Sequence, residues 1–367
     1  MMKLRMPRYF EQFHCVGGDC PDTCCRDWEV VLEPETAERY RAVPGALGAD
    51  IRSALTEADG EPCLLLRGGF CPMLDARGLC RIQLELGEAY LSGSCRQHPR
   101  FAEEYGALRE WSLSLACPEA VRLMLAEGEP MAFSEALTDE PVVSYHDLDP
   151  GLYLRLSAAR NTAFALAQDR TAPWQTRLAR LLSFGALLQK QLDQHRLCRL
   201  ETVTARFAEG RYPATPAVGG NPEDAAALTA CLRELEPINR AWPELLEETL
   251  GMRLTAEDRR RFAEETAQIS YEYEHLMVYY LYRYFLKAVT DRRLLPRLQL
   301  MAVGVLVVRQ MEAARWLRSG LSLDGRIELI HCFSREVEHS ETNLRLLDGM
   351  FAAEARLTPA FLTGAAW

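Results

Sequence analysis

The stretch CVGGDCPDTCC, residues 15–25, places four cysteines and two glycines within one short segment. Thiols at this density indicate either a disulfide framework or a metal centre. The opening MMKLRMPRYF has basic residues but no apolar run after them, so neither a signal peptide nor a transmembrane helix is evident. We therefore expect a cytoplasmic protein with no membrane partner. Because thiols stay reduced in the cytoplasm, the segment predicts metal ligation.

The cysteines concentrate in the first third of the chain, where nine of the twelve lie at or before residue 117. Seven of them are ligand candidates: Cys15, Cys20, Cys24, Cys25, Cys71, Cys80 and Cys95. Four thiolates satisfy either tetrahedral zinc or a four-iron cluster, and ligand type alone does not separate the two. The adjacent Cys24 and Cys25 cannot easily bind one ion together, so the spacing leaves the ligand set open. Buried reduced thiols without metal are the simplest alternative.

The pattern of the chain changes after residue 130. Residues 1–130 are rich in Cys, Gly and Pro, and residues 131–150 have the acidic, turn-rich character of a connector. Short strands or helix fragments are expected at 28–34, 63–66 and 79–86. Beyond the connector, apolar residues at three- and four-residue spacing predict helices over 151–169, 173–197, 223–235, 255–288, 294–318 and 324–348. The Gly- and Pro-rich stretch 211–223 predicts an exposed loop.

These patterns predict a mainly α protein of two units. A Cys-rich, loop-dominated metal-binding region, residues 1–130, packs on a helical domain, residues 131–367, that contributes the substrate site. With 367 residues and 48% hydrophobic residues, the chain is long enough for both cores. Its net charge of −10 argues against a protein that coats nucleic acid, and favours a protein or small-molecule partner. The oligomeric state does not follow from the sequence.

Six blocks of the sequence have a familiar arrangement. They are MPRYFEQFHCVGGDCPDTCCRDWEVVLEPETAERY (6–40), FCPMLDARGLCRIQLELG (70–87), SCRQHPR (94–100), LSLACPEAVRLML (113–125), ISYEYEHLMVYYLYRYF (269–285) and FSREVEHSETNLRLL (333–347). Together they resemble the bacterial flagellin lysine N-methylase family. The first two blocks also resemble cysteine-cluster domains that chelate zinc or iron.

The resemblance implies methyl transfer from S-adenosylmethionine to a lysine nitrogen of a surface protein, with flagellin as the expected partner. It also implies a 4Fe-4S cluster in the enzyme, with zinc as the alternative metal. The positions that match the family's cysteines are Cys20, Cys24, Cys25, Cys71, Cys80 and Cys95, with Cys15 and Cys117 as further matches. Which four of them hold iron stays open.

Two departures from common cofactor motifs bear on the mechanism. No glycine-rich turn joins a clear strand to a helix, so a Rossmann-like adenosylmethionine site is not marked and the cofactor-binding residues are unknown. Asp27 stands where a third cysteine would complete a radical-enzyme motif after Cys20 and Cys24. We therefore do not expect radical chemistry of the three-cysteine type.

Lysine methylation requires a neutral amine, although a free lysine with a pKa of about 10.4 is protonated near neutrality. An aromatic, desolvating channel and a nearby acceptor would supply that deprotonation. The tyrosines of block 269–285 are candidates for the channel, and both C-terminal blocks contain a Glu-His step. The candidate catalytic residues are Tyr271, Glu274, His275, Arg335, Glu338 and His339. The alternative is a hydrogen-bond network that pins two helices together.

Other functions are compatible with the same cysteines. A non-catalytic iron- or zinc-binding module in metal handling or electron transfer would bind metal but not adenosylmethionine. A protein scaffold held by zinc would be colourless, whereas an iron–sulfur protein is brown.

Overall fold

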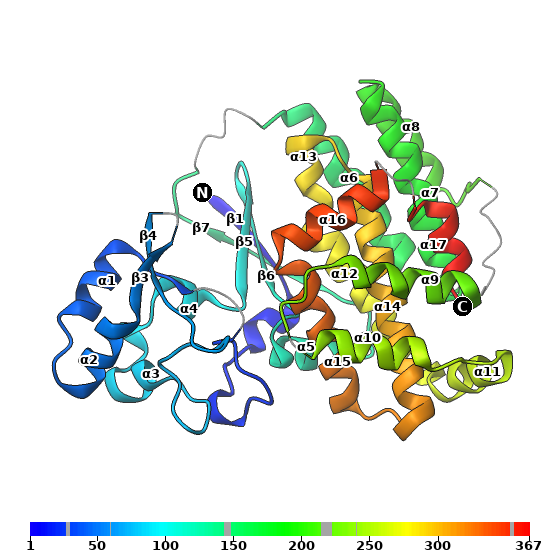
Figure 1. The fold of residues 1–367 in the computed structure, drawn as a ribbon. Helices are drawn as coiled ribbons and strands as arrows, with labels where there is room; N and C mark the ends of the chain where they lie inside the picture. Colours follow the sequence, from blue (N-terminus) through cyan, green and yellow to red (C-terminus); the bar gives the residue numbers. More distant parts are fainter. Residues whose placement is uncertain (27–29, 59, 143–147, 214–221, 240, 353–355) are drawn as a thin grey trace.

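The computed structural model describes residues 1–367 except 27–29, 59, 143–147, 214–221, 240 and 353–355. The described chain is mostly helical, with strands only in its N-terminal 138 residues. Figure 1 shows the early elements α1 to α4 on one side and the later helices on the other, with strands β1, β5 and β6 between them. The mainly helical expectation is therefore confirmed.

The Cys-rich region contains a small sheet and four short helices. Its antiparallel sheet has the order β2-β4-β3, formed by Val30–Val31, Glu61–Leu64 and Leu55–Ala58. The helices are α1 (Pro34–Arg41), α2 (Gly45–Ala54), α3 (Arg81–Leu86) and α4 (Gly93–Gln97). Their apolar faces form a core of their own around Tyr40, Ile51 and Met73. The region is thus built on secondary structure, which corrects the expectation that loops dominate it.

A second sheet joins the two parts of the chain. Its order is β5-β6-β1-β7, formed by Arg100–Tyr105, Leu108–Leu113, Met2–Pro7 and Phe133–Thr138. Strand β1 lies parallel to β6 and antiparallel to β7, with Lys3 opposite both Leu108 and Leu137. Strand β7 occupies part of the segment expected to be a connector, and α5 (Pro118–Leu125) follows β6. The boundary at residue 130 stays a prediction.

Eleven longer helices make up most of the remaining described chain. They are α6 (Pro150–Ala167), α7 (Trp174–Asp193), α8 (Leu197–Ala208), α9 (Pro222–Cys231), α10 (Trp242–Gly251), α11 (Ala256–Glu265), α12 (Tyr271–Tyr284), α14 (Leu295–Ser319), α15 (Leu323–Glu338), α16 (Glu341–Ala352) and α17 (Pro359–Ala365). The four-residue α13 (Ala288–Asp291) and short 3₁₀ turns at Arg8–Gln12, Gly17–Asp19, Glu88–Tyr90, Leu232–Glu234, Ala267–Ile269 and Phe285–Lys287 complete the described elements.

Helix α14 is the centre of the helical part. Every residue from Leu298 to Ala314 is buried, because apolar residues occur on all faces of this helix. Gly304 lets α12 approach closely, since a Cβ at that position would lie 2.8 Å from the Tyr280 ring. Helices α14 and α12 therefore position the polar residues described below.

The predicted helices were right in type and partly wrong in extent. The segment 255–288 divides into α11 and α12, and 324–348 divides into α15 and α16 at His339 and Ser340. Of the three short N-terminal segments, 63–66 overlaps strand β4, 79–86 contains helix α3, and 28–34 contains β2, with Trp28 and Glu29 outside the described residues. Most of the predicted loop 211–223 also lies outside them. No helix in the described ranges has the length and apolarity needed to span a membrane.

Candidate functional site

Five of the predicted metal ligands converge in the Cys-rich region. The thiols of Cys24 and Cys25 hydrogen-bond each other, and Cys25 also bonds Cys71. The Cys71 amide donates to the Cys25 carbonyl at 2.8 Å, which holds the two distant segments together. Burial raises the pKa of Cys95 to about 11, and its neighbours Cys24 and Cys80 act in the same direction. Three loops far apart in the sequence therefore bring their sulfurs to one place.

Cys20 lies to one side of this group. Burial raises the pKa of its thiol, and the nearby Cys15 and Cys24 act in the same direction. Burial likewise raises the pKa of Cys117, and there the nearby Cys20 and Cys24 add to the increase. Cys24 is thus the residue that the two sets of thiols share. Of the six ligands predicted from the resemblance, five form the main group and Cys20 faces the neighbouring one.

The described thiols are not arranged around a single metal ion. Within the described ranges, no three or more His, Cys, Asp or Glu side chains are placed to hold one metal ion. A four-iron cluster is larger than an ion and spreads its four thiolate ligands further apart. The donor set of five thiols, of which Cys71 is buried and Cys25, Cys80 and Cys95 are partly buried, fits such a cluster by its chemistry.

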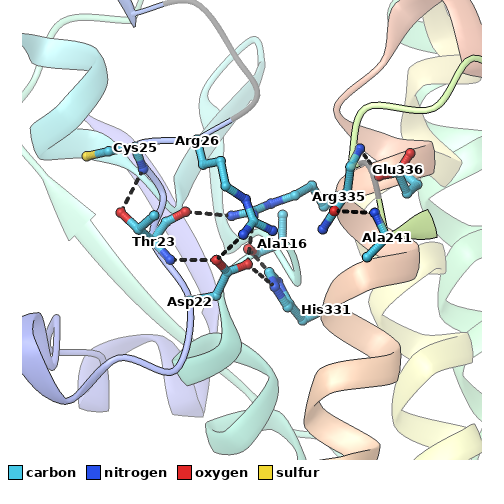
Figure 2. A network of polar contacts seen from close by, with 10 residues as sticks. Asp22, Thr23, Cys25, Arg26, Ala116, Ala241, His331, Arg335 and Glu336 are labelled. Carbon is cyan, nitrogen blue, oxygen red and sulfur yellow. Dashed lines mark hydrogen bonds and ion pairs between the residues drawn. The ribbon is translucent and has the colours of Figure 1, made fainter. Parts of the chain in front are cut away.

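A polar network ties the cysteine loop to helix α15. Figure 2 shows Asp22 facing His331 and Arg335, two side chains that project from α15. The Asp22 carboxylate accepts from His331 Nε2 at 2.8 Å and from Arg335 at 2.7 Å, and Arg335 also donates to the Thr23 carbonyl at 2.9 Å. Burial alone would raise the pKa of Asp22, but His331 and Arg335 outweigh it and lower the pKa to about 2. The ionised Asp22 carboxylate therefore ties the cysteine loop to α15 at this junction.

A small cavity lies beside the junction and is lined by Cys24, Arg335 and His339 together with His98. Its volume of about 30 Å³ suits one or two water molecules. Burial lowers the pKa of His339 to about 4, and the charges of Arg283 and Arg335 add to that shift. The His339 ring is therefore neutral near pH 7, and its Nε2 lies 2.7 Å from Ser114 Oγ. Three predicted site residues thus meet here, in a space too small for a substrate.

Glu338 is enclosed by tyrosines of α12. Its carboxylate accepts from Tyr279 at 2.8 Å, from Tyr284 at 2.7 Å and from Tyr280 at 3.3 Å. Burial raises the pKa of each of these phenols, so they stay protonated and act only as donors. The predicted tyrosine channel is therefore filled by a carboxylate of the protein itself, and the contacts match the alternative of a network that pins α12 to α15.

The other three predicted residues lie at the opposite end of α12. The Glu274 carboxylate is fully buried and binds Arg170 through two bonds of 2.9 Å and Arg177 through one of 2.7 Å. His275 directs its two ring nitrogens at the carbonyls of Met124 and Glu129, and Tyr271 donates to the carbonyl of Leu125. The six candidates therefore form two separate groups.

An open cleft of about 770 Å³ adjoins this second group. Its described lining comes from the loop between α6 and α7, the start of α7, the chain from the end of α11 to the start of α12, the loop after α5, and one residue of α14. Tyr271 and Glu274 line the cleft, together with three arginines that are Arg170, Arg177 and Arg309. A volume of this size accommodates a nucleoside-sized molecule. Among the sites described so far, this is the one with room for a ligand.

Several residues of these sites had not been singled out from the sequence. Asp22 follows the predicted ligand Cys20 by two positions, and only its pairing with α15 reveals its role. Arg170 lies in the loop between α6 and α7, whereas Arg177 and Arg309 come from segments that the sequence predicts as ordinary helices. Their signal would have been arginines on apolar helix faces, as in VLVVRQM (305–311).

Comparison with known proteins shows the family to which the chain belongs. The FliB lysine N-methylase C-terminal domain matches residues 160–363, more than half of the chain. The chain therefore belongs to the FliB lysine N-methylase family, which confirms the resemblance seen in the sequence. All of the helical lining of the cleft, from α7, α11, α12 and α14, lies within the matched region.

Three relatives come from Salmonella. The lysine-N-methylases of Salmonella typhimurium strain LT2 and of Salmonella choleraesuis are each 30% identical over 212 residues, covering 55% of this chain and 52% of each relative. The flagellar biosynthetic protein FliU of Salmonella muenchen is 35% identical over 136 residues, covering 35% of this chain and 80% of FliU. The match thus spans about half the length of the two lysine-N-methylases. No solved structure matches the chain.

Proposed function

We propose that this protein is an S-adenosylmethionine-dependent protein-lysine N-methyltransferase that acts on a flagellin-type protein. The main support for this proposal is the location of the open cleft, because its helical walls belong to the matched lysine N-methylase domain. The cavity beside Cys24 is too small for a lysine side chain and a methyl donor. We therefore assign the reaction to the cleft.

The reaction forms one bond and breaks another. The lone pair of the lysine nitrogen attacks the methyl carbon of adenosylmethionine, the C–N bond forms, and the C–S bond electrons return to sulfur. The products are a methylated lysine, S-adenosylhomocysteine and a proton. Holding nitrogen and methyl in line at about 3 to 3.5 Å supplies much of the rate.

The lining of the cleft suits a lysine that must lose its proton. Arg170, Arg177 and Arg309 place positive charge around it, and like charge lowers the pKa of an incoming ammonium. Glu129 also lines the cleft, is exposed, and offers a carboxylate that attracts the lysine before the proton leaves. Tyr271 provides an aromatic wall, and Glu274 fixes the position of two arginines.

The remaining predicted residues are assigned to positioning. His275 holds the loop after α5, and Glu338 holds the tyrosines of α12. Arg335 and His339 stand at the junction between α15 and the Cys-rich region. These contacts support a role in placing the cysteine region against the helical domain.

We further propose that Cys24, Cys25, Cys71, Cys80 and Cys95, with Cys20 beside them, supply the ligands of a 4Fe-4S cluster, zinc being the alternative. A bound cluster adds iron–thiolate bonds that cross-link the three loops, and a centre able to exchange one electron. Asp22 and Arg335 hold this region on α15 whether or not metal is bound.

The direct test incubates purified protein with adenosylmethionine and flagellin from the same organism under anaerobic, iron-replete conditions. Mass spectrometry should show lysines heavier by one methyl group, and Tyr271→Ala should reduce their yield. Absence of methylated lysine in flagellin would count against the function. Iron, sulfide and zinc analysis of the same preparation tests the metal, because an iron–sulfur protein contains sulfide and is brown, whereas a zinc protein is colourless.

A further inference from the structure

A pair of opposite charges lies beside the thiols to which the cluster is assigned. Arg335 of α15 donates to the Asp22 carboxylate at 2.7 Å and to the Thr23 carbonyl at 2.9 Å. Thr23 directly precedes Cys24 in the chain, and Arg335 and Cys24 line the same small cavity. Figure 2 shows Arg335 reaching from α15 to this loop, which also carries Cys25. The guanidinium and the carboxylate are therefore held close to the thiol group.

The Asp22 carboxylate is not available as a metal ligand. Its Oδ2 accepts from His331 and Arg335, and its Oδ1 accepts from the Thr23 amide at 2.7 Å. Because both oxygens already have donors within the protein, this carboxylate acts on the neighbouring thiols through its charge. The same holds for Arg335, since a guanidinium has no lone pair to offer to a metal.

Both charges are largely shielded from water. The Arg335 side chain is 9% exposed and the Asp22 side chain is 16% exposed. Solvent and salt screen charges at such positions much less than charges on the surface, so their fields extend to the neighbouring atoms. Because the two charges are paired, removal of either one leaves the other uncompensated.

The thiol group also receives hydrogen bonds that suit negative sulfur. The Cys80 sulfur accepts from the amides of Ile82 and Gln83 at the start of α3, and the Cys71 sulfur accepts from the Met73 amide. The reduction potential of an iron–sulfur cluster depends on its net charge, on hydrogen bonds to its sulfurs and on its exposure. The amide donors belong to the backbone, whereas the charges of Arg335 and Asp22 can be changed by substitution.

We propose that Arg335 and Asp22 tune the reduction potential of the cluster in opposite directions. Reduction by one electron makes the cluster more negative, so the Arg335 charge raises the potential and the Asp22 charge lowers it. The electron comes from an external one-electron donor, which is oxidised in the same step. The inference rests on the proposed cluster, but not on the methyltransferase activity. It makes Arg335 a positioning residue that also sets the electrostatics of the metal centre.

The test is a redox titration of the anaerobically purified full chain with dithionite and mediator dyes. It is run at one fixed pH, because His331 also contacts Asp22. Arg335→Gln should lower the midpoint potential and Asp22→Asn should raise it. At a fixed potential, each should change the ratio of reduced to oxidised cluster by up to roughly tenfold, about 59 mV for a one-electron centre. The double variant should lie between the two.

Two controls separate charge from structure. Arg335→Lys keeps the charge and loses the fork of donors, so its potential should stay near that of wild type. A purely structural role would shift this variant as far as Arg335→Gln. Arg260→Gln, at an exposed position of α11 and far from α1 to α4 in Figure 1, should have no effect. The midpoint is measured on the loaded fraction, so a variant that binds less iron still reports its potential.

The outcomes also separate this inference from the proposed function. Equal midpoints for wild type, Arg335→Gln and Asp22→Asn, or shifts of the same sign, would overturn the inference and leave the cluster and the methylation intact. A colourless protein without sulfide would overturn both the cluster and its tuning. Opposite shifts in a protein that does not methylate flagellin would support the tuning and refute the proposed function.

Discussion

Glu312 is expected to make the protein less stable as the pH rises. Its side chain lies on α14, is 1% exposed, and accepts from the Tyr273 hydroxyl at 2.6 Å. Burial raises the pKa of Glu312 to about 7, because the Tyr273 hydrogen bond and the Arg309 charge oppose the shift only in part. The neighbouring Glu272 carboxylate adds to the increase.

The sign follows from which state holds the proton. Below about pH 4.5, the ordinary pKa that the unfolded chain retains, Glu312 is protonated in both states. Between pH 4.5 and about 7 the unfolded state loses the proton while the folded state keeps it, so stability falls as the pH rises. A difference of about two to three pKa units corresponds to about 3 kcal/mol that is lost by pH 8.

Glu312→Gln removes this titration and keeps an acceptor for Tyr273. We expect the variant to match wild type near pH 4.5 and to exceed it by up to about 3 kcal/mol at pH 8 in the free energy of unfolding, measured with urea. Glu38→Gln, at an exposed position of α1, should show no such dependence. A difference between Glu312→Gln and wild type that stays constant from pH 4.5 to pH 8 would refute the reasoning.

Three further changes test other parts of the structure. Arg160→Met leaves the Glu110 carboxylate buried without its bidentate partner and should lower the free energy of unfolding by about 3–5 kcal/mol, whereas apolar replacement of both residues should recover much of that loss. Cys80→Ser should lower the iron bound per chain after anaerobic purification, whereas Cys198→Ser, at an exposed position of α8, should not. Thr255→Ala removes the capping box of α11 and should cost about 1 kcal/mol in urea unfolding.

Each of these has an outcome that contradicts it. A double replacement no more stable than Arg160→Met alone would mean that the loss does not come from an unpaired Glu110 carboxylate. Iron content that is unaffected by Cys80→Ser would remove that thiol from the ligand set. Wild-type stability of the Thr255→Ala variant would show that the capping box does not contribute to the free energy of unfolding.

The sequence predicted the helical part well because its periodicity is local. Residues 300–308, LMAVGVLVV, are apolar on all sides of the helix, and such a run indicates burial directly. The breaks inside 255–288 and 324–348 were missed because no Gly or Pro marks them. Helix α15 ends at Glu338 where the side chain is engaged by three tyrosines, and this is a tertiary contact that no local pattern records.

The sheets were harder to foresee than the helices. Strand β1 pairs with residues more than a hundred positions away, and its alternation of buried and exposed residues is incomplete. Strand β7 lies in the segment that was expected to be a connector. Acidic and turn-forming residues beside it obscure the sequence pattern of this six-residue strand. Pairing between distant segments has no signature in either segment alone.

The candidate site was predicted in its residue types and not in its grouping. The cysteines of three segments converge as expected, because only ligation or a shared core explains such a concentration. The sequence grouped the Glu-His steps of the two C-terminal blocks as candidate catalytic residues, but Glu274 lies near the start of α12, whereas Glu338 on α15 contacts tyrosines near the end of α12. The arginines of the cleft were not singled out, since their partners are distant in the sequence and come from α6, α12 and Trp367.

The central place of β1 has a consequence for how the chain folds during synthesis. Residues 2–7 leave the ribosome well before both of their neighbouring strands, 108–113 and 133–138. A chain arrested before residue 108 has a β1 segment with no strand to join, and unpaired strand segments attract chaperones and other nascent chains. Nascent chains that have exposed residues up to about 140 should therefore resist protease far better than those that stop near residue 105.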